Sequence, residues 1–186
     1  MSQICTEKAL PAAFRQGLLT AGDKLHELTR YVHCFSFGLE SVERLPRLGL
    51  SDMDSAHIHD SIAMEIFDGK LKYGNAGLFF GQGESRKLVA AILNTHGDDQ
   101  QIDEEKVDVL CEVANIVVNT CLEFLSPILK RRLSAGVPAL FSQDFGKFVL
   151  DSGQADQSFL VLRSSFENTE KNMLGKITIL LPYAEM

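Results

Sequence analysis

The strongest constraint on the fold is the segment from about residue 104 to 133, which has the composition of a long, mostly buried helix. Its stretch DVLCEVANIVVN (108–119) places two acids and two amides among apolar residues, at spacings of four, three and four. At about 100° per residue, the four fall within an arc of about 60°: Asp108, Glu112, Asn115 and Asn119. Because buried carboxylates and amides without partners are costly, this narrow polar stripe must reach solvent or a partner.

A solvated helix face is the ordinary explanation of such a stripe. Faces of that kind are rich in Lys, Glu, Gln and Arg, whereas asparagine is a poor helix former and occurs twice here. The two asparagines therefore count against a merely solvated face, which remains the alternative at this point.

Helices and strands alternate along the rest of the chain. Apolar periodicity and turn residues predict helices over 10–33 and 83–94, and a disturbance of the long helix at Pro127. A polar turn is expected over 95–101. Strands are expected at 61–67, 75–80, 147–150, 158–166 and 176–183. Strands in hairpin order favour an antiparallel sheet with helices on it, an α+β fold.

The two halves of the chain resemble each other when one is shifted by 92 residues. Glu112, Asn115 and Pro138 then fall on Thr20, Asp23 and Pro46, and several leucines fall on apolar positions. We interpret this as a decayed internal duplication within one domain spanning 1–186, with halves of about 8–95 and 102–186. The alternative is that two amphipathic helices always match in some register.

Composition restricts the partners. The chain has 186 residues and a net charge of −7, which disfavours nucleic acid and anionic membranes and favours a basic partner surface. No run approaches the roughly 18 apolar residues of a membrane span, and the N-terminus lacks the pattern of a secretion signal. The four cysteines lack CxxC spacing and are expected to be free thiols in a reducing cytoplasm.

Three short motifs invite functional readings that we set aside. GQGESRK (81–87) lacks the further residues of a phosphate-binding loop and predicts a strand-to-helix turn capped by Ser85 or Glu84. HIHD (57–60) has no further ligand placed to complete a metal site, so no metal is expected. The basic cluster at 130–132 is expected to offset the dipole at a helix C-terminus, with contact to an acidic partner as the alternative.

The pattern Asp108-x3-Glu112-x2-Asn115-x22-Pro138 resembles the signature of the CheC/CheX/FliY phosphatases of bacterial chemotaxis. EVANIVVNTCLEFL resembles the motif helix of that family, and NAGLFFGQGESRKLVAAIL resembles its strand-turn-helix unit. The resemblance covers most of the chain and is weaker over the first 60 residues. It implies a pseudo-twofold α+β fold with a central antiparallel sheet flanked by helices. It also implies dephosphorylation of a CheY-like response regulator, which carries its own Mg²⁺, so no cofactor is expected on this chain.

The resemblance implies catalytic roles for Glu112 and Asn115. An uncharged amide suits Asn115 to positioning the attacking water, and the carboxylate of Glu112 can pair with a lysine of the regulator. Asp108 and Asn119 are expected to contact the partner. Pro138 is expected to shape the start of the next strand.

The first half departs from the family pattern. Thr20 is too short to replace the glutamate, and Asp23 carries a charge that repels a phosphoryl group, so this site is expected to be inactive. One intact motif resembles the CheX arrangement, and because CheX proteins are dimers the resemblance admits a homodimer. The alternative is a non-catalytic, FliM-like module that binds a receiver domain, a CheD-like deamidase or a flagellar switch component.

Overall fold

The computed structural model describes residues 3–29, 35–46, 59–95, 104–141, 158–168 and 173–183. These residues form three helices and seven strands. In chain order they are α1 (Gln3–Leu28), β1 (Phe35–Pro46), β2 (Asp60–Asp68), β3 (Leu71–Phe80), α2 (Glu84–Leu93), α3 (Glu104–Leu129), β4 (Leu133–Ala135), β5 (Ala139–Leu140), β6 (Ser158–Asn168) and β7 (Met173–Tyr183).

The strands form one antiparallel sheet in the order β1-β6-β7-β3-β2-β4, and β5 also pairs with β2. The order is symmetric about its centre: β1 corresponds to β4, β6 corresponds to β2, and β7 corresponds to β3. A pseudo-twofold axis therefore passes between β3 and β7. The predicted α+β fold with a pseudo-twofold antiparallel sheet is confirmed.

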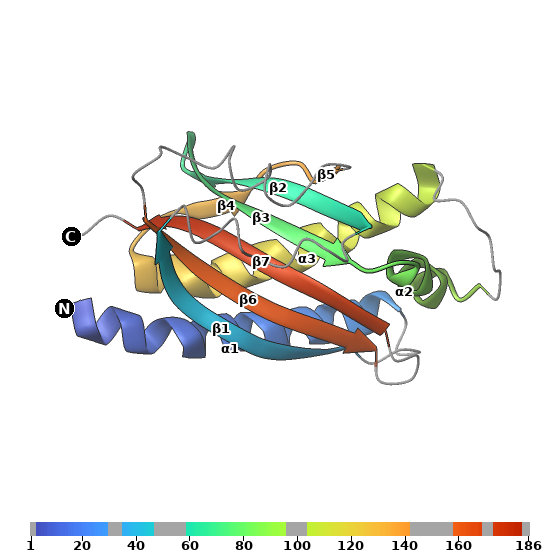
Figure 1. The fold of residues 1–186 in the computed structure, drawn as a ribbon, viewed down its shortest axis with the longest axis horizontal. Helices are drawn as coiled ribbons and strands as arrows, with labels where there is room; N and C mark the ends of the chain where they lie inside the picture. Colours follow the sequence, from blue (N-terminus) through green and yellow to red (C-terminus); the bar gives the residue numbers. More distant parts are fainter. Residues whose placement is uncertain are drawn as a thin grey trace.

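The two long helices lie on the same face of the sheet and run in opposite directions (Figure 1). Their backbones approach closely where they cross: a Cβ added at Gly17 would lie only 2.8 Å from the Cα of Cys121. The main core lies between this helix layer and the sheet, and includes Phe14 and Leu18 from α1 and Leu110 and Val117 from α3.

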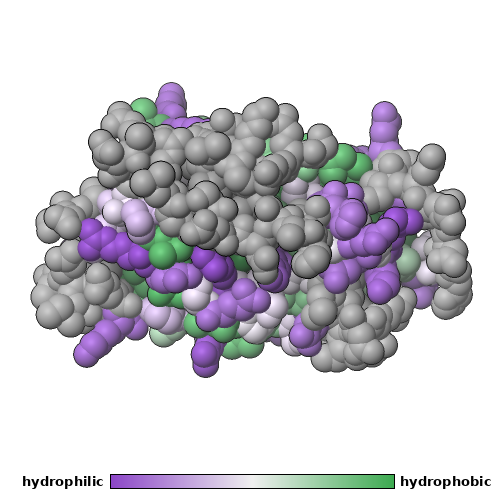
Figure 2. All heavy atoms as spheres, viewed as in Figure 1, coloured by the Kyte–Doolittle hydropathy of each residue, from purple (hydrophilic) through white to green (hydrophobic). Residues whose placement is uncertain are grey.

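Alternation along β2 explains which side of the sheet faces the helices. Ile62, Met64 and Ile66 are buried in the main core, whereas Glu65 between them is exposed. The other face of the sheet has a smaller buried cluster: Phe79, Phe159, Val161 and Leu180. On that side of the molecule, hydrophilic side chains surround small apolar areas (Figure 2).

Several predicted elements are confirmed with small changes of length, namely the helix over 83–94 and the strands over 61–67, 75–80, 158–166 and 176–183. The first helix ends at Leu28, before the predicted residue 33, and residues 30–34 lie outside the described part. The predicted strand near 147–150 and most of the predicted turn over 95–101 also lie outside it. β1, β4 and β5 were not predicted.

The long helix was predicted to continue to about residue 133, and this was wrong. It ends at Leu129, only two residues after Pro127, and Lys130 takes a left-handed conformation with φ of 53°. Leu133–Ala135 form β4 instead, paired with the end of β2.

Acidic and amide residues interrupt the apolar residues of α3, so that no uninterrupted run reaches the roughly 18 residues of a membrane span. By overall length and composition, however, α3 is apolar enough to cross a membrane. Its apolar residues nevertheless lie in the protein core, since Leu110, Val113, Val117 and Leu125 are each at most 1% exposed. We therefore interpret α3 as the central core helix of the fold.

Candidate functional site

The polar stripe of α3 lies on the side of the helix that is turned away from the main core. Asp108 and Glu112 are exposed, and Asn115 and Asn119 are half-buried. Val113, Ala114, Val117 and Val118, which lie between them in the sequence, are buried. α3 thus holds its apolar surface in the core and presents two acids and two amides along one line.

The chain that follows α3 returns beside this stripe. The amide N–H of Ala135 in β4 donates to Oδ1 of Asn119 at 3.1 Å. Further on, the carbonyl oxygen of Pro138 lies 3.7 Å from Sγ of Cys111, and β5 begins at the next residue. The spacing between Asn115 and Pro138 therefore spans the rest of the helix and a return to its middle, in agreement with a structural role for Pro138.

Asn119 joins the stripe to the returning strand. Its Nδ2 donates to the backbone oxygen of Asn115 at 3.1 Å and to Oδ1 of Asn115 at 2.7 Å. Its Oδ1 accepts from Ala135. The carboxamide that we expected to contact a partner is thus engaged within the protein, and Asp108 and Glu112 are the exposed members of the stripe.

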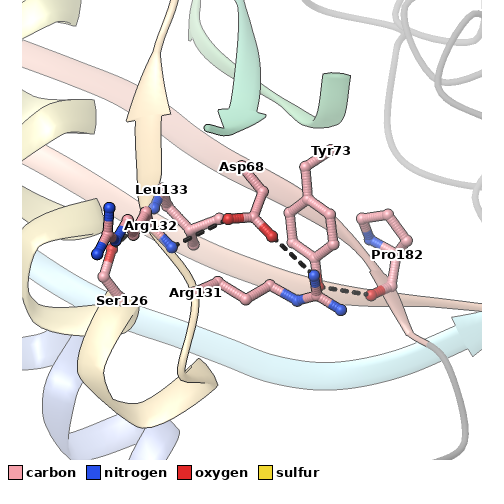
Figure 3. A network of polar contacts seen from close by, with 7 residues as sticks. All are labelled: Asp68, Tyr73, Ser126, Arg131, Arg132, Leu133 and Pro182. Carbon is pink, nitrogen blue, oxygen red and sulfur yellow. Dashed lines mark hydrogen bonds and ion pairs between the residues drawn. The ribbon is translucent and has the colours of Figure 1, made fainter. Parts of the chain in front are cut away.

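Asp68, at the end of β2, holds the connection between α3 and β4 (Figure 3). Its Oδ2 accepts from Nη1 of Arg131 at 2.8 Å, and its Oδ1 accepts from the backbone N–H of Arg132 at 3.0 Å. The hydrogen bond from Arg131, followed by that from Arg132, lowers the pKa of Asp68. The Arg131 guanidinium also stacks 4.5 Å above the ring of Tyr73.

Two further hydrogen bonds secure the same corner of the fold. Ser126 Oγ donates to the carbonyl oxygen of Leu122 at 2.7 Å and accepts from the N–H of Leu133 at 3.3 Å. Arg131, which the sequence placed at a helix C-terminus, is therefore part of an internal contact that ties α3 to the β2–β3 hairpin. The position of β4 beside the stripe depends on this corner.

The first-half counterparts lie on α1, on a different helix from Glu112 and Asn115. Thr20 is half-buried and Asp23 is exposed. The adjacent Lys24 reaches across to α3, where its ammonium donates to Oγ1 of Thr120 at 3.0 Å and lies 3.5 Å from Oε2 of Glu123. This part of α1 is therefore bound to α3 of the same chain.

The two cysteines of α3 are free thiols. Burial raises the pKa of the Cys121 thiol strongly. Burial and, to a lesser extent, the charge of Asp108 raise the pKa of the Cys111 thiol. Neither environment favours the thiolate that nucleophilic catalysis requires.

The strand-to-helix turn before α2 is present, but the predicted cap by Ser85 or Glu84 is wrong, because the N-cap is Gly83 and no described side chain caps the helix. Glu84 Oε2 accepts from the N–H of Gly81 at 2.6 Å, and Gly83 has a left-handed φ of 77°. The Ser85 hydroxyl donates to Asp60. In the described ranges no three His, Cys, Asp or Glu side chains meet as a metal site would require, and His57 lies outside them.

No protein-family model and no curated protein matches the sequence. The fold, however, is the CheC-like fold of chemotaxis proteins, which the FliM middle domain also has. The resemblance to CheC, CheX and FliY that the sequence indicated is confirmed at the level of the fold.

Three solved structures illustrate this similarity. FliY from Thermotoga maritima superimposes with a TM-score of 0.71 at 12% identity, covering 98% of this chain and 91% of that one. The FliM middle domain from H. pylori gives 0.63 at 12% identity, covering 98% and 94%. CheX from Desulfovibrio desulfuricans gives 0.57 at 14% identity, covering 90% and 98%.

Proposed function

We propose that this chain is a cytoplasmic phosphatase that hydrolyses the aspartyl phosphate of a CheY-like response regulator. The observation that carries the proposal is the pair formed by exposed Glu112 and half-buried Asn115, one turn apart on a rigid core helix. The fold shared with CheX and FliY supports the same reaction.

The chemistry asks little of the phosphatase. An aspartyl phosphate is an activated acyl phosphate, and the regulator supplies the Mg²⁺ that neutralises developing charge. Water attacks phosphorus, the bond between phosphorus and the aspartate oxygen breaks, and inorganic phosphate and the free carboxylate leave. The phosphatase must place that water in line and exclude other geometries.

Asn115 suits this task because its carboxamide is uncharged and both donates and accepts. Its carbonyl oxygen would accept from the attacking water, and its NH₂ would donate to a phosphoryl oxygen. Glu112 would pair with a lysine of the regulator and so hold α3 against the regulator's active site. Asp108, on the same exposed side, would add to the attraction for a basic surface.

The test is the decay of an acyl-phosphate-labelled receiver domain in Mg²⁺, with and without this protein. The wild type should accelerate decay. Asn115→Ala should lose about 100-fold in turnover because the water is no longer placed. Glu112→Ala should weaken activity mainly through KM, because it removes the anchoring pair.

The matched control is the double variant Thr20→Ala and Asp23→Ala, which alters the equivalent positions on α1. It should keep wild-type turnover, since we propose that the first-half site is inactive. Acceleration that survives in Asn115→Ala, or that disappears in the control, would refute the assignment of the site.

A second candidate is a non-catalytic interaction module. It is favoured by the structural similarity to FliM middle domains, including structures described as FliG–FliM and FliM–SpeE complexes. In that case the chain would bind a receiver domain, a CheD-like protein or a flagellar switch component without accelerating decay. Light scattering of the purified protein would separately test for a homodimer.

A further inference from the structure

We propose that Asn119 is a positioning residue for Asn115, whose side-chain carboxamide it holds with the oxygen turned toward the NH₂ group of Asn119. Asn119 would act through Asn115 and would not touch the substrate. The role rests on the proposed phosphatase activity, whereas the orientation itself can be tested in the free protein.

The orientation of Asn119 follows from its two backbone neighbours. The N–H of Ala135 can only donate, so the atom 3.1 Å from it must be the oxygen of the Asn119 carboxamide. The backbone oxygen of Asn115 can only accept, so the atom 3.1 Å from it must be the nitrogen. The two contacts independently require the same orientation, which removes the usual ambiguity between amide oxygen and nitrogen.

The orientation of Asn115 then follows from that of Asn119. The Asn119 NH₂ group can only donate hydrogen bonds. The side-chain atom of Asn115 that lies 2.7 Å from it must therefore be the acceptor Oδ1. The NH₂ group of Asn115 is consequently directed away from Asn119. The second lone pair of Oδ1 is available to accept from a water molecule.

Fixing this amide matters because the terminal torsion of asparagine is broad and roughly two-fold. Without Asn119 the carboxamide could turn over and exchange its donor and acceptor ends, which would misplace the attacking water. Asn119 is itself held by β4 at the edge of the sheet. Ala135 of β4 pairs with Ile66 of β2, and the backbone N–H of Arg132 just before β4 donates to Asp68. Asn119 thus transmits the rigidity of the sheet to the site.

Two substitutions test this role. Asn119→Leu removes all three side-chain hydrogen bonds of Asn119 at similar volume. Asn119→Asp can still accept from Ala135, but its carboxylate cannot donate to Asn115 and would attract the NH₂ end instead. With labelled receiver domain and Mg²⁺, each should lower kcat by about tenfold or more while KM changes less than about twofold.

A pH profile distinguishes positioning from loss of structure. Protonation of the carboxyl in Asn119→Asp restores a donor, so its kcat deficit relative to wild type should narrow as pH falls. The deficit of Asn119→Leu should not change with pH. The matched control is Glu123→Gln, an exposed position one turn further along α3, which should keep wild-type kcat and KM.

NMR spectra of the ¹⁵N-labelled free protein give a readout that does not need turnover, because they resolve the side-chain NH₂ signals of Asn115 and Asn119. The Asn115 pair should shift in Asn119→Asp and Asn119→Leu and remain in place in Glu123→Gln. An unmoved Asn115 signal, or a loss confined to KM, would overturn the inference. Absence of wild-type turnover together with the expected shifts would refute the proposed function and leave the orientation standing.

Discussion

At the scale of single residues, Glu112 and Asn115 occupy neighbouring positions of one stripe in different environments. Glu112 is exposed, as an anchor for a partner's lysine should be. Asn115 is half-buried and its oxygen accepts from Asn119, as a group that must hold one orientation should be. The difference in exposure matches the difference in the roles that we propose.

The thiols of α3 lead to a prediction about chemical reactivity. Because burial raises the pKa of Cys121 and removes it from solvent, alkylation at pH 8 should modify it in the native protein at least about 100-fold more slowly than in urea. Cys111, half-buried with a raised pKa, should react at an intermediate rate. Mass-spectrometric peptide mapping over time measures both rates, and fast native labelling of Cys121 would contradict the packing of α1 on α3.

The stripe could be predicted from the sequence because helical periodicity alone fixes which residues of α3 share a face. The bridge from Asn119 to Ala135 could not. It depends on where the chain turns after α3, and that turn is fixed in part by Asp68, which lies 63 residues before Arg131 in the sequence.

At the scale of elements, the corner around Asp68 determines where α3 ends and where β4 lies. Its hydrogen bonds to Arg131 and Arg132 favour the ionised carboxylate and lower its pKa in the folded protein. Asp68→Asn should therefore lower the urea midpoint at neutral pH. As the pH falls through the lowered pKa, wild-type Asp68 becomes protonated and the difference between the two proteins should vanish.

Urea titrations followed by circular dichroism at several pH values measure this dependence. Glu65→Gln is the matched control, because Glu65 belongs to the same hairpin and pairs with Lys72 at 2.6 Å on an exposed surface. Its effect should be smaller, since exposed ion pairs contribute little. A difference for Asp68→Asn that is independent of pH would argue against the pairing with Arg131.

The failure of the sequence to predict β1, β4 and β5 and the end of α3 has identifiable physical causes. β1 alternates buried and exposed residues only as far as its bulge between Leu39 and Ser41, where the two-residue period is interrupted. β4 and β5 have three and two residues, too few for any period to be recognised. The long helix appeared to continue because LSA after Arg132 carries no strong turn signal.

At the scale of the whole molecule, the pseudo-twofold relation makes the crossing of α1 and α3 central to stability. Alanine normally favours a helix over glycine by about 1 kcal/mol. At Gly17 the added Cβ would lie 2.8 Å from the Cα of Cys121, and a backbone atom cannot move aside cheaply. Gly17→Ala should therefore destabilise the protein by about 1–3 kcal/mol.

Urea denaturation measures that change. Gln16→Ala is the control, since Gln16 is the neighbouring residue on the same helix and is exposed. It should stay within about 0.5 kcal/mol of wild type. A Gly17→Ala protein as stable as wild type would show that the two helices can separate without cost.

The strand order also determines when the fold can be completed during synthesis. Among the described strands, β1 has β6 as its neighbour, and their register joins Pro46 to Ser158 and Phe35 to Asn168. A nascent chain can form the β2–β3 hairpin early, but β1 must wait until β6 has left the ribosome. Pairing of strands so far apart in the sequence is slow, because the loop-closure entropy is lost before the stabilising contacts form. Until then β1 and β3 present open edges to other chains, so this protein depends on its last strands to protect its first ones from aggregation.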